Sequence, residues 1–382
     1  MFNFHLKTKI VFGQSANIAL SAELKTLGAD HILLVSDPGL EKLGLVDDLT
    51  AAVKAENIRV TLFTRVTSNP TTDEVAEGLA LARGEKINAL VALGGGSPID
   101  VAKGIAMLLS NGGTYADYQW GGKAITLRSA PLVAIPTTAG TGSEVSKVAV
   151  IVDPKNSFKK GVLSPLMFPH AAIVDPTLTR GLPPDLTAAT GMDAFIHALE
   201  AYIGLRANPF TDQFALASLR TAYENLPRAV ADGKDIQARE KMMLAALWGG
   251  IAMDHAGLGL VHSLSGPLSA HGHLHHGLSN ALILPYVLRF NSPDIPPTRL
   301  KTLKNLFGLN VKQNENDLFE VARDFVTELG LPTTLSEINI KLDDKERHRI
   351  AAETMRMVLI KNNPRTTSEA DCIALLEEMA PL

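Results

Sequence analysis

The sequence is short of cysteine, and its first residues do not resemble a secretory leader. Its 382 residues include a single cysteine, Cys372, so an internal disulfide is impossible. The first residues, Met1 to Lys7, lack the apolar core and the small-residue cleavage site of a signal peptide. We therefore expect a cytoplasmic protein.

Long hydrophobic runs and a strong excess of charge are also missing. No apolar run approaches the ~20 residues that span a bilayer, and the formal net charge is only −4. Such a small charge provides no field to attract nucleic acid or an anionic membrane. Hydrophobic residues make up 46% of the chain and charged residues 20%, which excludes global disorder. We expect a globular protein with a small-molecule partner.

The length predicts two domains, because single hydrophobic cores stop growing near 250 to 300 residues. Up to about residue 180, short β-branched runs alternate with helical patterns, which is typical of a mostly parallel sheet covered on both faces. A Rossmann-like α/β nucleotide-binding domain is predicted for residues 1–182. The expected strands are Lys9–Phe12, His31–Ser36, Arg59–Phe63, Ala89–Leu93, Pro131–Ile135, Val148–Val152 and Ala172–Val174.

The second half has helical periodicity almost throughout. The segment Gly181-Leu-Pro-Pro-Asp185 is a typical helix start, with prolines suited to the first turn and an acid at the amino end. Near the end of the chain, Ser368 is placed to cap the last helix. An all-helical domain is therefore predicted for residues 183–382.

A run of glycines between a predicted strand and a predicted helix indicates a phosphate site. It reads Gly94-Gly-Gly-Ser97-Pro98, and glycines let the backbone approach an anion at the helix amino terminus. The alternative is an ordinary helix start, with Ser97 as N-cap and Pro98 at the first position. Three consecutive glycines exceed what capping needs, so nucleotide binding is the favoured interpretation.

Two further features agree with a nucleotide. The segment from Thr137 to Ser143 is rich in hydroxyls and glycines and follows a predicted strand, where α/β proteins commonly bind ligands. Asp37 ends an early strand, where a carboxylate accepts hydrogen bonds from a ribose diol and repels a 2′-phosphate. This favours NAD over NADP, although a turn residue is the commoner role for such an aspartate.

The helical half contains a candidate metal site. Asp193 and His197 are four residues apart on one helix face, and His262 and His276 could complete the ligand set. One carboxylate and three imidazoles suit Fe²⁺ or Zn²⁺ better than Mg²⁺ or Ca²⁺. A surface salt bridge is the usual alternative, but an apolar helix makes unpaired polar groups costly.

Five of the eleven histidines lie between residues 262 and 276. Because His276 is followed by Gly277 and an apolar helix, we expect it to be the most buried histidine of the tract that starts at His271. His271, His273 and His275 are left as loop surface or pocket lining.

At these residues the sequence resembles the iron-containing (group III) alcohol dehydrogenase family, of the lactaldehyde reductase and 1,3-propanediol dehydrogenase type. The resemblance covers nearly the whole chain. The motifs are Gly94-Gly-Gly-Ser-Pro-Ile-Asp100, Pro136-Thr-Thr-Ala-Gly-Thr-Gly-Ser-Glu144, Ala188-Ala-Thr-Gly-Met-Asp-Ala-Phe-Ile-His197 and His276-Gly-Leu-Ser-Asn-Ala-Leu-Ile-Leu-Pro285.

The resemblance implies a metal-dependent, NAD(H)-linked alcohol dehydrogenase or aldehyde reductase, with the substrate oxygen on a divalent metal. Iron is the implied metal, with zinc as the alternative, and a homodimer is implied. The metal ligands, which act in catalysis through the metal, would be Asp193, His197, His262 and His276. The cofactor contacts would be Asp37, Asn69, Gly95, Gly96, Ser97, Thr137, Thr138, Thr141, Lys160 and Leu178.

The sequence also departs from that family. Gly266 stands where many members carry a second histidine beside the nicotinamide, so a proton-relay group is missing. Lys147, Asp254, His255 and Lys361 fall near positions that are usually apolar or small, which indicates a rebuilt substrate pocket. Lys147 and the extra histidines either hold an anionic or larger substrate or are surface residues. The substrate itself, including whether it is anionic, stays open.

Other functions share these features. Glycerol dehydrogenase-like and maleylacetate reductase-like specificities are the nearest alternatives. A dehydroquinate synthase-like lyase has the same architecture, but its first metal ligand is typically glutamate, where this chain has Asp193. A noncatalytic metal or nucleotide sensor is the remaining possibility.

Overall fold

The protein divides into two compact units. The structure, a computed structural model, describes residues 2–119, 122–155, 158–309 and 316–380. One unit is His5–Arg180, and the other is Gly181–Leu382 together with the chain up to Phe4. The sequence places the boundary two residues later, after residue 182, and gives no sign that the start of the chain packs with the helical unit.

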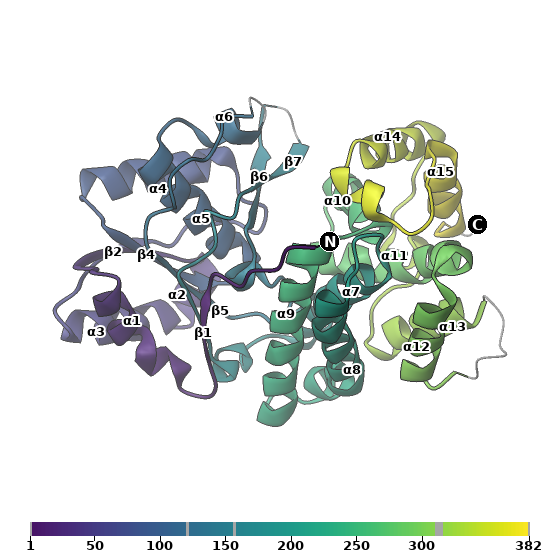
Figure 1. Ribbon diagram of the computed structural model, residues 1–382, viewed down its shortest axis with the longest axis horizontal. Helices are drawn as coiled ribbons and strands as arrows, with labels where there is room; N and C mark the ends of the chain where they lie inside the picture. Colours follow the sequence, from purple (N-terminus) through teal and green to yellow (C-terminus); the bar gives the residue numbers. More distant parts are fainter. Residues whose placement is uncertain (1, 120–121, 156–157, 310–315, 381–382) are drawn as a thin grey trace. The chain divides into compact units, whose positions relative to one another are not determined.

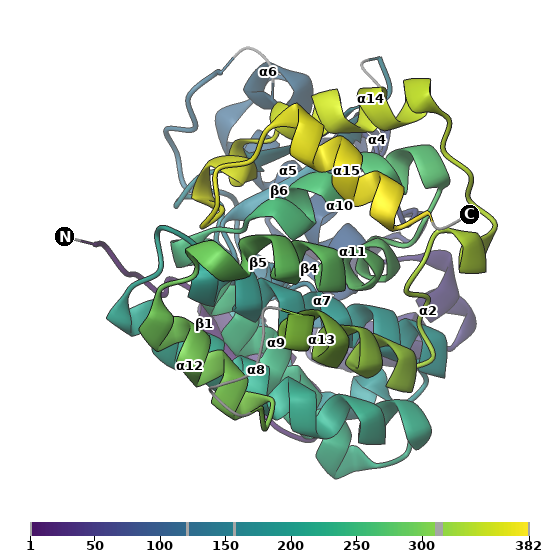
Figure 2. The same ribbon diagram turned by 90° about the vertical axis from the view of Figure 1, so that its right-hand side faces the viewer.

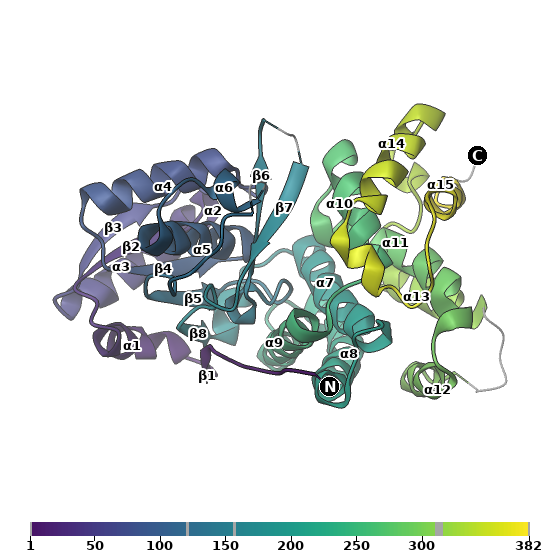
Figure 3. The same ribbon diagram turned by 45° about the horizontal axis from the view of Figure 1, so that its top comes forward.

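The first unit is built on a six-stranded parallel sheet (Figure 1), with the strand order β1-β8-β5-β4-β2-β3. Its strands are β1 (Lys9–Phe12), β2 (His31–Val35), β3 (Arg59–Phe63), β4 (Ala89–Gly94), β5 (Leu132–Pro136) and β8 (Ala171–Val174). A separate antiparallel pair, β6 (Val148–Asp153) and β7 (Phe158–Leu163), is visible as a hairpin in Figure 3. Each expected strand is present within a residue or two, but β7 is missing from the sequence-based prediction because its sequence, FKKGVL, is lysine-rich and contains glycine.

Helices cover both faces of this sheet because its strands are apolar on both sides. Leu33 and Val35 of β2 pack in the core with residues of α4 and α5, whereas Ile32 and Leu34 pack in a second core with residues of α1 and α3. This alternation is the period of two expected of a strand. The helices of this unit are α1 (Leu20–Thr26), α2 (Pro38–Lys42), α3 (Leu45–Ala55), α4 (Thr72–Gly84), α5 (Gly96–Asn111) and α6 (Tyr115–Gln119).

The strand order brings the expected cofactor segments to one edge of the sheet. β2, β4 and β5 are neighbours and parallel, so the loops that follow them leave from the same edge. The chain goes from β2 to β3 on one side and then to β4 on the other, which makes a topological switch point between β2 and β4. Ligands of open α/β sheets bind at such a point.

The second unit is helical in its described residues (Figure 2). Its central helix, α7 (Pro184–Ile203), begins with the predicted proline and is buried along most of its length. Ser368 caps α15, as predicted. The other helices are α8 (Pro209–Ala231), α9 (Ile236–Ala256), α10 (Leu260–Gly272), α11 (His276–Asn291), α12 (Pro297–Leu306), α13 (Asn316–Glu328), α14 (Asp344–Met355) and α15 (Glu369–Glu378).

Within the described residues, no single helix is long and apolar enough to cross a membrane. The pair α9 and α10 passes that test only as two segments bent by 105°.

The start of the chain packs on the helical unit through an aromatic cluster. Phe4 stacks on Phe214 and on His255, with ring centroids 5.7 and 4.2 Å apart. The side chains of His255 and its neighbour Asp254 are only 5% and 2% exposed. Both side chains are therefore buried, and a surface position is wrong for His255, whose ring stacks on Phe4.

Candidate metal centre

Helix α7 places a carboxylate and an imidazole on one face. Asp193 and His197 lie one turn apart, their side chains are 5% and 6% exposed, and Asp193 Oδ1 is 3.6 Å from His197 Nε2. The neighbouring residues of the helix are buried and apolar. Burying two polar side chains in this way is costly unless each has a partner.

Two further helices bring histidines to the same carboxylate. His262 of α10 and His276 of α11 point Nε2 at Asp193 Oδ1, at 3.3 and 3.8 Å. Helix α11 approaches α7 closely at Gly277, where a Cβ atom would lie 2.1 Å from the carbonyl oxygen of Ala189. The glycine after His276 is thus required for the approach that brings this histidine to Asp193.

Three of the four expected ligands form a compact group. The ligand atoms of Asp193, His262 and His276 all lie within 4.8 Å of one another. His197 is close to Asp193 but stands outside that group, with its ring stacked on His262 at 4.7 Å between centroids. The structure thus gathers Asp193, His262 and His276 into one group and places His197 beside Asp193.

One detail of the sequence-based expectation is wrong. The side chain of His276 is 38% exposed, whereas that of His271 is 21% exposed, so His276 is not the most buried histidine of the tract. His276 is the first residue of α11, while His271 pairs with Glu353 at 3.2 Å. A ligand at the edge of an accessible site is expected to keep such exposure.

The electrostatics of the group are strongly coupled. Burial by itself would raise the pKa of Asp193, but the histidines around it outweigh burial and hold that pKa well below its usual range. Burial would lower the pKa of His262, but hydrogen bonds to Asp193 and Glu200 raise it to about 9. In the absence of an ion, the group therefore holds a proton that a cation would have to displace.

Two residues that the sequence analysis missed complete the surroundings. Glu200 Oε2 is 2.6 Å from His262 Nδ1, and Asn280 Nδ2 donates to Asp193 Oδ1 at 2.8 Å. Helical spacing could have found both residues. Glu200 lies seven residues after Asp193 on α7, and Asn280 lies four after His276 on α11, so each shares a face with a candidate ligand.

The donor set fits a divalent transition metal. Asn280 Nδ2 also lies 3.2 Å from Nε2 of both His262 and His276, so it occupies the point on which the three candidate ligands converge. Its Oδ1 is buried and has no hydrogen-bond partner within the described residues. One carboxylate oxygen and two imidazole nitrogens that face a common point are the ligand atoms expected of a site for a divalent transition metal.

In the α/β unit, the glycine run and the hydroxyl-rich loop are in contact. A Cβ atom on Gly95 would lie 3.3 Å from the side chain of Thr138, and one on Gly96 would lie 2.9 Å from Thr141 Cγ2. These two segments follow β4 and β5. The structure thus brings together glycine and threonine positions expected to contact the cofactor, with little room for larger side chains.

The capping interpretation of this segment is wrong. Gly95, not Ser97, is the N-cap of α5, and the Ser97 hydroxyl donates instead to the carbonyl oxygen of Ser68, beside Asn69. Asp37, which follows the neighbouring strand β2, does act as an N-cap, since its Oδ1 accepts from the backbone of Gly39 and Leu40. Asp37 therefore has the turn role that the sequence allowed. Only its Oδ1 takes part in capping, and Oδ2 does not.

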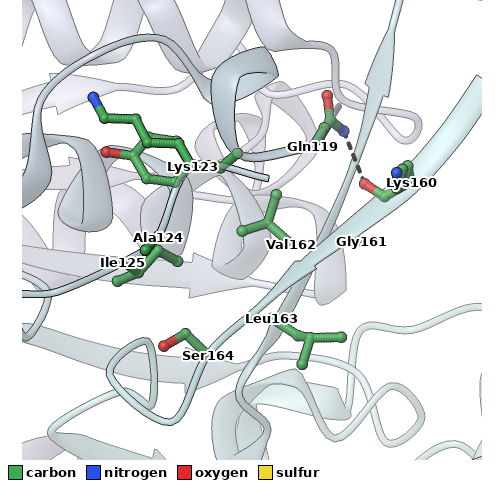
Figure 4. Close-up of a pocket in the computed structure, with 10 residues that line it drawn as sticks. Gln119, Lys123, Ala124, Ile125, Lys160, Gly161, Val162, Leu163 and Ser164 are labelled. Atoms are coloured by element: carbon green, nitrogen blue, oxygen red, sulfur yellow. Dashed lines mark hydrogen bonds between the residues drawn. The ribbon is translucent and has the colours of Figure 1, made fainter. Parts of the chain in front are cut away.

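A pocket of about 290 Å³ lies elsewhere in the α/β unit, between the end of α6, the following loop and β7 (Figure 4). Of the ten expected cofactor residues, only Lys160 lines it. Gln119 at its edge donates to the carbonyl oxygens of Ile151 and Lys160 and so holds α6 to the hairpin. Leu178 lies apart from this pocket, in the short 3-10 turn Pro176–Thr179.

The α/β unit also contains a buried ionic cluster. Lys103 of α5 is fully buried, and its Nζ donates to Ser143 Oγ at 2.8 Å, Ser146 Oγ at 3.2 Å and the carbonyl oxygen of Val148 at 2.7 Å. Asp100 accepts from the Ser143 hydroxyl at 2.5 Å. The cluster fastens the hydroxyl-rich loop to α5.

Comparison with known proteins places the chain in a defined group. Residues 7–176 match the family model described as iron-containing alcohol dehydrogenase, and residues 187–380 match that of the Fe-containing alcohol dehydrogenase family, C-terminal. The chain is 36% identical to the NAD-dependent methanol dehydrogenase of Bacillus methanolicus, over 99% of each chain.

Solved structures agree with this match. A 1,3-propanediol oxidoreductase structure is 34% identical with a TM-score of 0.94, covering 99% of this chain and 100% of that one. A sulfoacetaldehyde reductase from Bifidobacterium kashiwanohense, in complex with NAD⁺, is 28% identical with a TM-score of 0.89, covering 100% of this chain and 99% of that one. The parallel-sheet unit followed by a helical unit is the fold that these proteins share.

Proposed function

The chain belongs to the iron-containing alcohol dehydrogenase family and is an NAD-linked oxidoreductase acting on CH–OH groups, and from that premise we propose the residues that perform the reaction. The ligands of the divalent metal are Asp193, His197, His262 and His276. The observation that carries this assignment is the convergence of Asp193 Oδ1 with the Nε2 atoms of His262 and His276.

The reaction is reversible hydride transfer between a small alcohol or aldehyde and the nicotinamide. When bound, the divalent ion supplies Lewis acidity that polarises the carbon–oxygen bond of the substrate. Asp193 stays ionised over the working pH range because its pKa is held well below the usual value. It therefore gives the site a permanent negative charge, while the histidines contribute neutral nitrogen donors.

The α/β unit holds NAD. Its proposed contacts are Asp37, Asn69, Gly95, Gly96, Ser97, Thr137, Thr138, Thr141, Lys160 and Leu178. Gly95 and Gly96 let the backbone come close to the pyrophosphate at the start of α5, and the threonine hydroxyls of the adjoining loop donate to it. The free oxygen of Asp37 favours a ribose diol over a 2′-phosphate, and hence NAD over NADP.

We further propose Fe²⁺ as the resident metal, a homodimer as the assembly and the cytoplasm as the compartment. The family match favours iron, although a set of three nitrogens and one oxygen also accepts Zn²⁺. The single cysteine is in keeping with a reducing compartment. Light scattering after gel filtration measures the assembly, and a monomer would overturn the dimer.

The decisive experiment is an anaerobic reconstitution with Fe²⁺ or Zn²⁺, followed by NADH consumption with a panel of small aldehydes. The panel includes sulfonated, phosphonated and carboxylated members, so that it also reports whether the substrate is anionic. Metal-dependent turnover that is lost in both Asp193→Asn and His262→Gln supports the ligand assignment. Full activity in either variant would overturn it.

A further inference from the structure

Glu200 is a buried carboxylate that the ligand set does not include. It lies on α7, is 2% exposed, and its neighbours on the helix are apolar. Burying an ionised carboxylate costs several kcal/mol unless it is well hydrogen-bonded. The contacts of the Glu200 carboxylate must therefore compensate for the free-energy cost of burying it.

Both oxygens of Glu200 are engaged with consecutive residues at the start of α10. Oε1 accepts from the backbone N–H of Val261 at 2.6 Å, and Oε2 lies 2.6 Å from His262 Nδ1. Val261 is in the first turn of the helix, where backbone N–H groups lack intrahelical acceptors. Glu200 therefore fixes both the start of the helix and the orientation of the imidazole.

The contact with Nδ1 determines which nitrogen of His262 carries a proton. An ionised carboxylate only accepts hydrogen bonds, so Nδ1 must be the protonated nitrogen. In the neutral ring this leaves the lone pair on Nε2, which is the atom that faces Asp193 Oδ1 at 3.3 Å. A histidine binds a metal through a nitrogen that carries no proton.

We propose that Glu200 is a positioning residue of the metal centre, which holds His262 in the Nδ1-protonated form and increases the basicity of its Nε2. The proposal rests on the assignment of His262 as a ligand. Glu200 is not one of the candidate ligands, and it acts on the metal centre through its contacts with His262 and the backbone of Val261. Carboxylate partners of this kind typically change metal affinity 10- to 100-fold when they are replaced.

The substitution Glu200→Gln tests the proposal sharply because it keeps the shape and reverses one hydrogen bond. If the amide oxygen still accepts from Val261 N–H, the amide nitrogen faces His262 Nδ1 and donates to it. The imidazole proton is then forced onto Nε2, which can no longer bind the ion. Zn²⁺ affinity, measured by chelator competition, is expected to fall about 10- to 100-fold.

Three other variants separate this role from alternatives. Glu200→Asp keeps the carboxylate and should recover part of the affinity. Glu353→Gln is the matched control, because Glu353 also contacts a histidine, His271, at 3.2 Å, outside the metal group. It should bind Zn²⁺ like the wild type. His262→Gln should lose affinity, and wild-type binding by this variant would refute the ligand assignment itself.

Nitrogen-15 NMR of labelled histidine supplies a readout that packing alone does not change. In the zinc-loaded wild type, the signal that His262→Gln removes should show its proton on Nδ1. In Glu200→Gln that signature should be lost, and in Glu200→Asp it should persist. Wild-type Zn²⁺ affinity in Glu200→Gln, or an unchanged proton position with equal losses in Glu200→Gln and Glu200→Asp, would overturn the proposal.

Discussion

Each unit of the protein buries a cluster of charged groups, and the two clusters are built differently. In the α/β unit, the three protons of Lys103 Nζ have three acceptors, supplied by Ser143, Ser146 and Val148. In the helical unit, Asp193, His262 and His276 turn their ligand atoms toward one another, and the buried Asn280 Oδ1 beside them has no partner in the described chain.

The difference separates a structural cluster, which we call the closed cluster (Lys103, Asp100, Ser143 and Ser146), from a functional one, which we call the open cluster (Asp193, His262 and His276). A buried cation whose donors are all satisfied by the protein stabilises a particular arrangement of the chain and needs nothing further. A group of nitrogen and oxygen ligand atoms that converge on one point is the arrangement that binds a cation. Burial of charge alone would therefore not have identified the metal site.

The largest expected effect comes from breaking the open cluster. Asp193→Asn removes its only carboxylate, and loss of Lewis acidity worth about 4 kcal/mol corresponds to roughly a thousandfold in rate. Metal content after dialysis and the rate of NADH consumption should both fall. Asp185→Asn, at an exposed position in the first turn of the same helix, is the control. If Asp193→Asn kept both its metal and its activity, the cluster of Asp193, His262 and His276 would not be the metal site.

Breaking the closed cluster should affect stability and leave the metal in place. Lys103→Met leaves Asp100 and the loop hydroxyls without their cation, which should lower the free energy of unfolding by about 3 to 5 kcal/mol. Denaturant unfolding measures the change, and metal content should match that of the wild type. Lys54→Met, on the exposed side of α3, serves as the control. If Lys103→Met lost metal without a change in the free energy of unfolding, the structural role assigned to Lys103 would be refuted.

A pH series sharpens the description of the closed cluster. Burial raises the pKa of Glu144, beside Lys103, from 4.5 to about 7. Because the folded state binds this proton more tightly, Glu144 favours folding below pH 4.5, and that contribution is lost as the pH rises through about 7. For this group the loss approaches about 1.4 kcal/mol per pH unit between the two values.

Glu144→Gln should remove that part of the pH dependence. The measurement is the free energy of unfolding of wild type and variant at several values between pH 4.5 and pH 7. Glu85→Gln, at an exposed position after α4, should follow the wild type. Parallel curves for the wild type and Glu144→Gln would show that the carboxyl group does not titrate as inferred.

The smallest effect is expected beside the open cluster. At Gly266, a Cβ atom would meet Met357 Cε at 3.6 Å and no other atom of the described residues within 4 Å, so a side chain can start there. Gly266→His should shift the pH profile of kcat/KM by introducing an imidazole that moves protons, at most about a hundredfold in rate at any pH. Metal content should not change, and Gly266→Ala should keep the wild-type profile. Equal losses of metal and rate would count against a proton-relay position.

The sequence predicted much of the fold because strand and helix periodicities are local. It failed at β7, whose lysines and glycine do not look like a strand, although backbone pairing with β6 makes it one. It also misplaced the start of α5, since Ser97 contacts the distant Ser68 instead of its own helix. At β7, pairing with the preceding strand outweighed the local preference, and at Ser97 a contact with a residue 29 positions away did so.

The candidate site was predictable only in part. Asp193 and His197 were recognisable because four residues make one helical turn, and the family motifs indicated His262 and His276. The exposure of His276 was misjudged, because coverage depends on which elements pack over the ring. Helical spacing places Glu200 on the same face as Asp193, but its role could not be predicted, because its partner His262 lies 62 residues away.

By itself the sequence determined the alternation of strands and helices, the glycine and hydroxyl segments and the family to which they point. Only the tertiary structure decided how α7, α10 and α11 meet, which imidazole nitrogen faces Asp193 and which carboxylate fixes it. The physical reason is that helical spacing orders side chains within one element. Contacts between elements depend on how their buried faces pack, and the glycine beside His276 that permits such a contact carries no local sign of its partner.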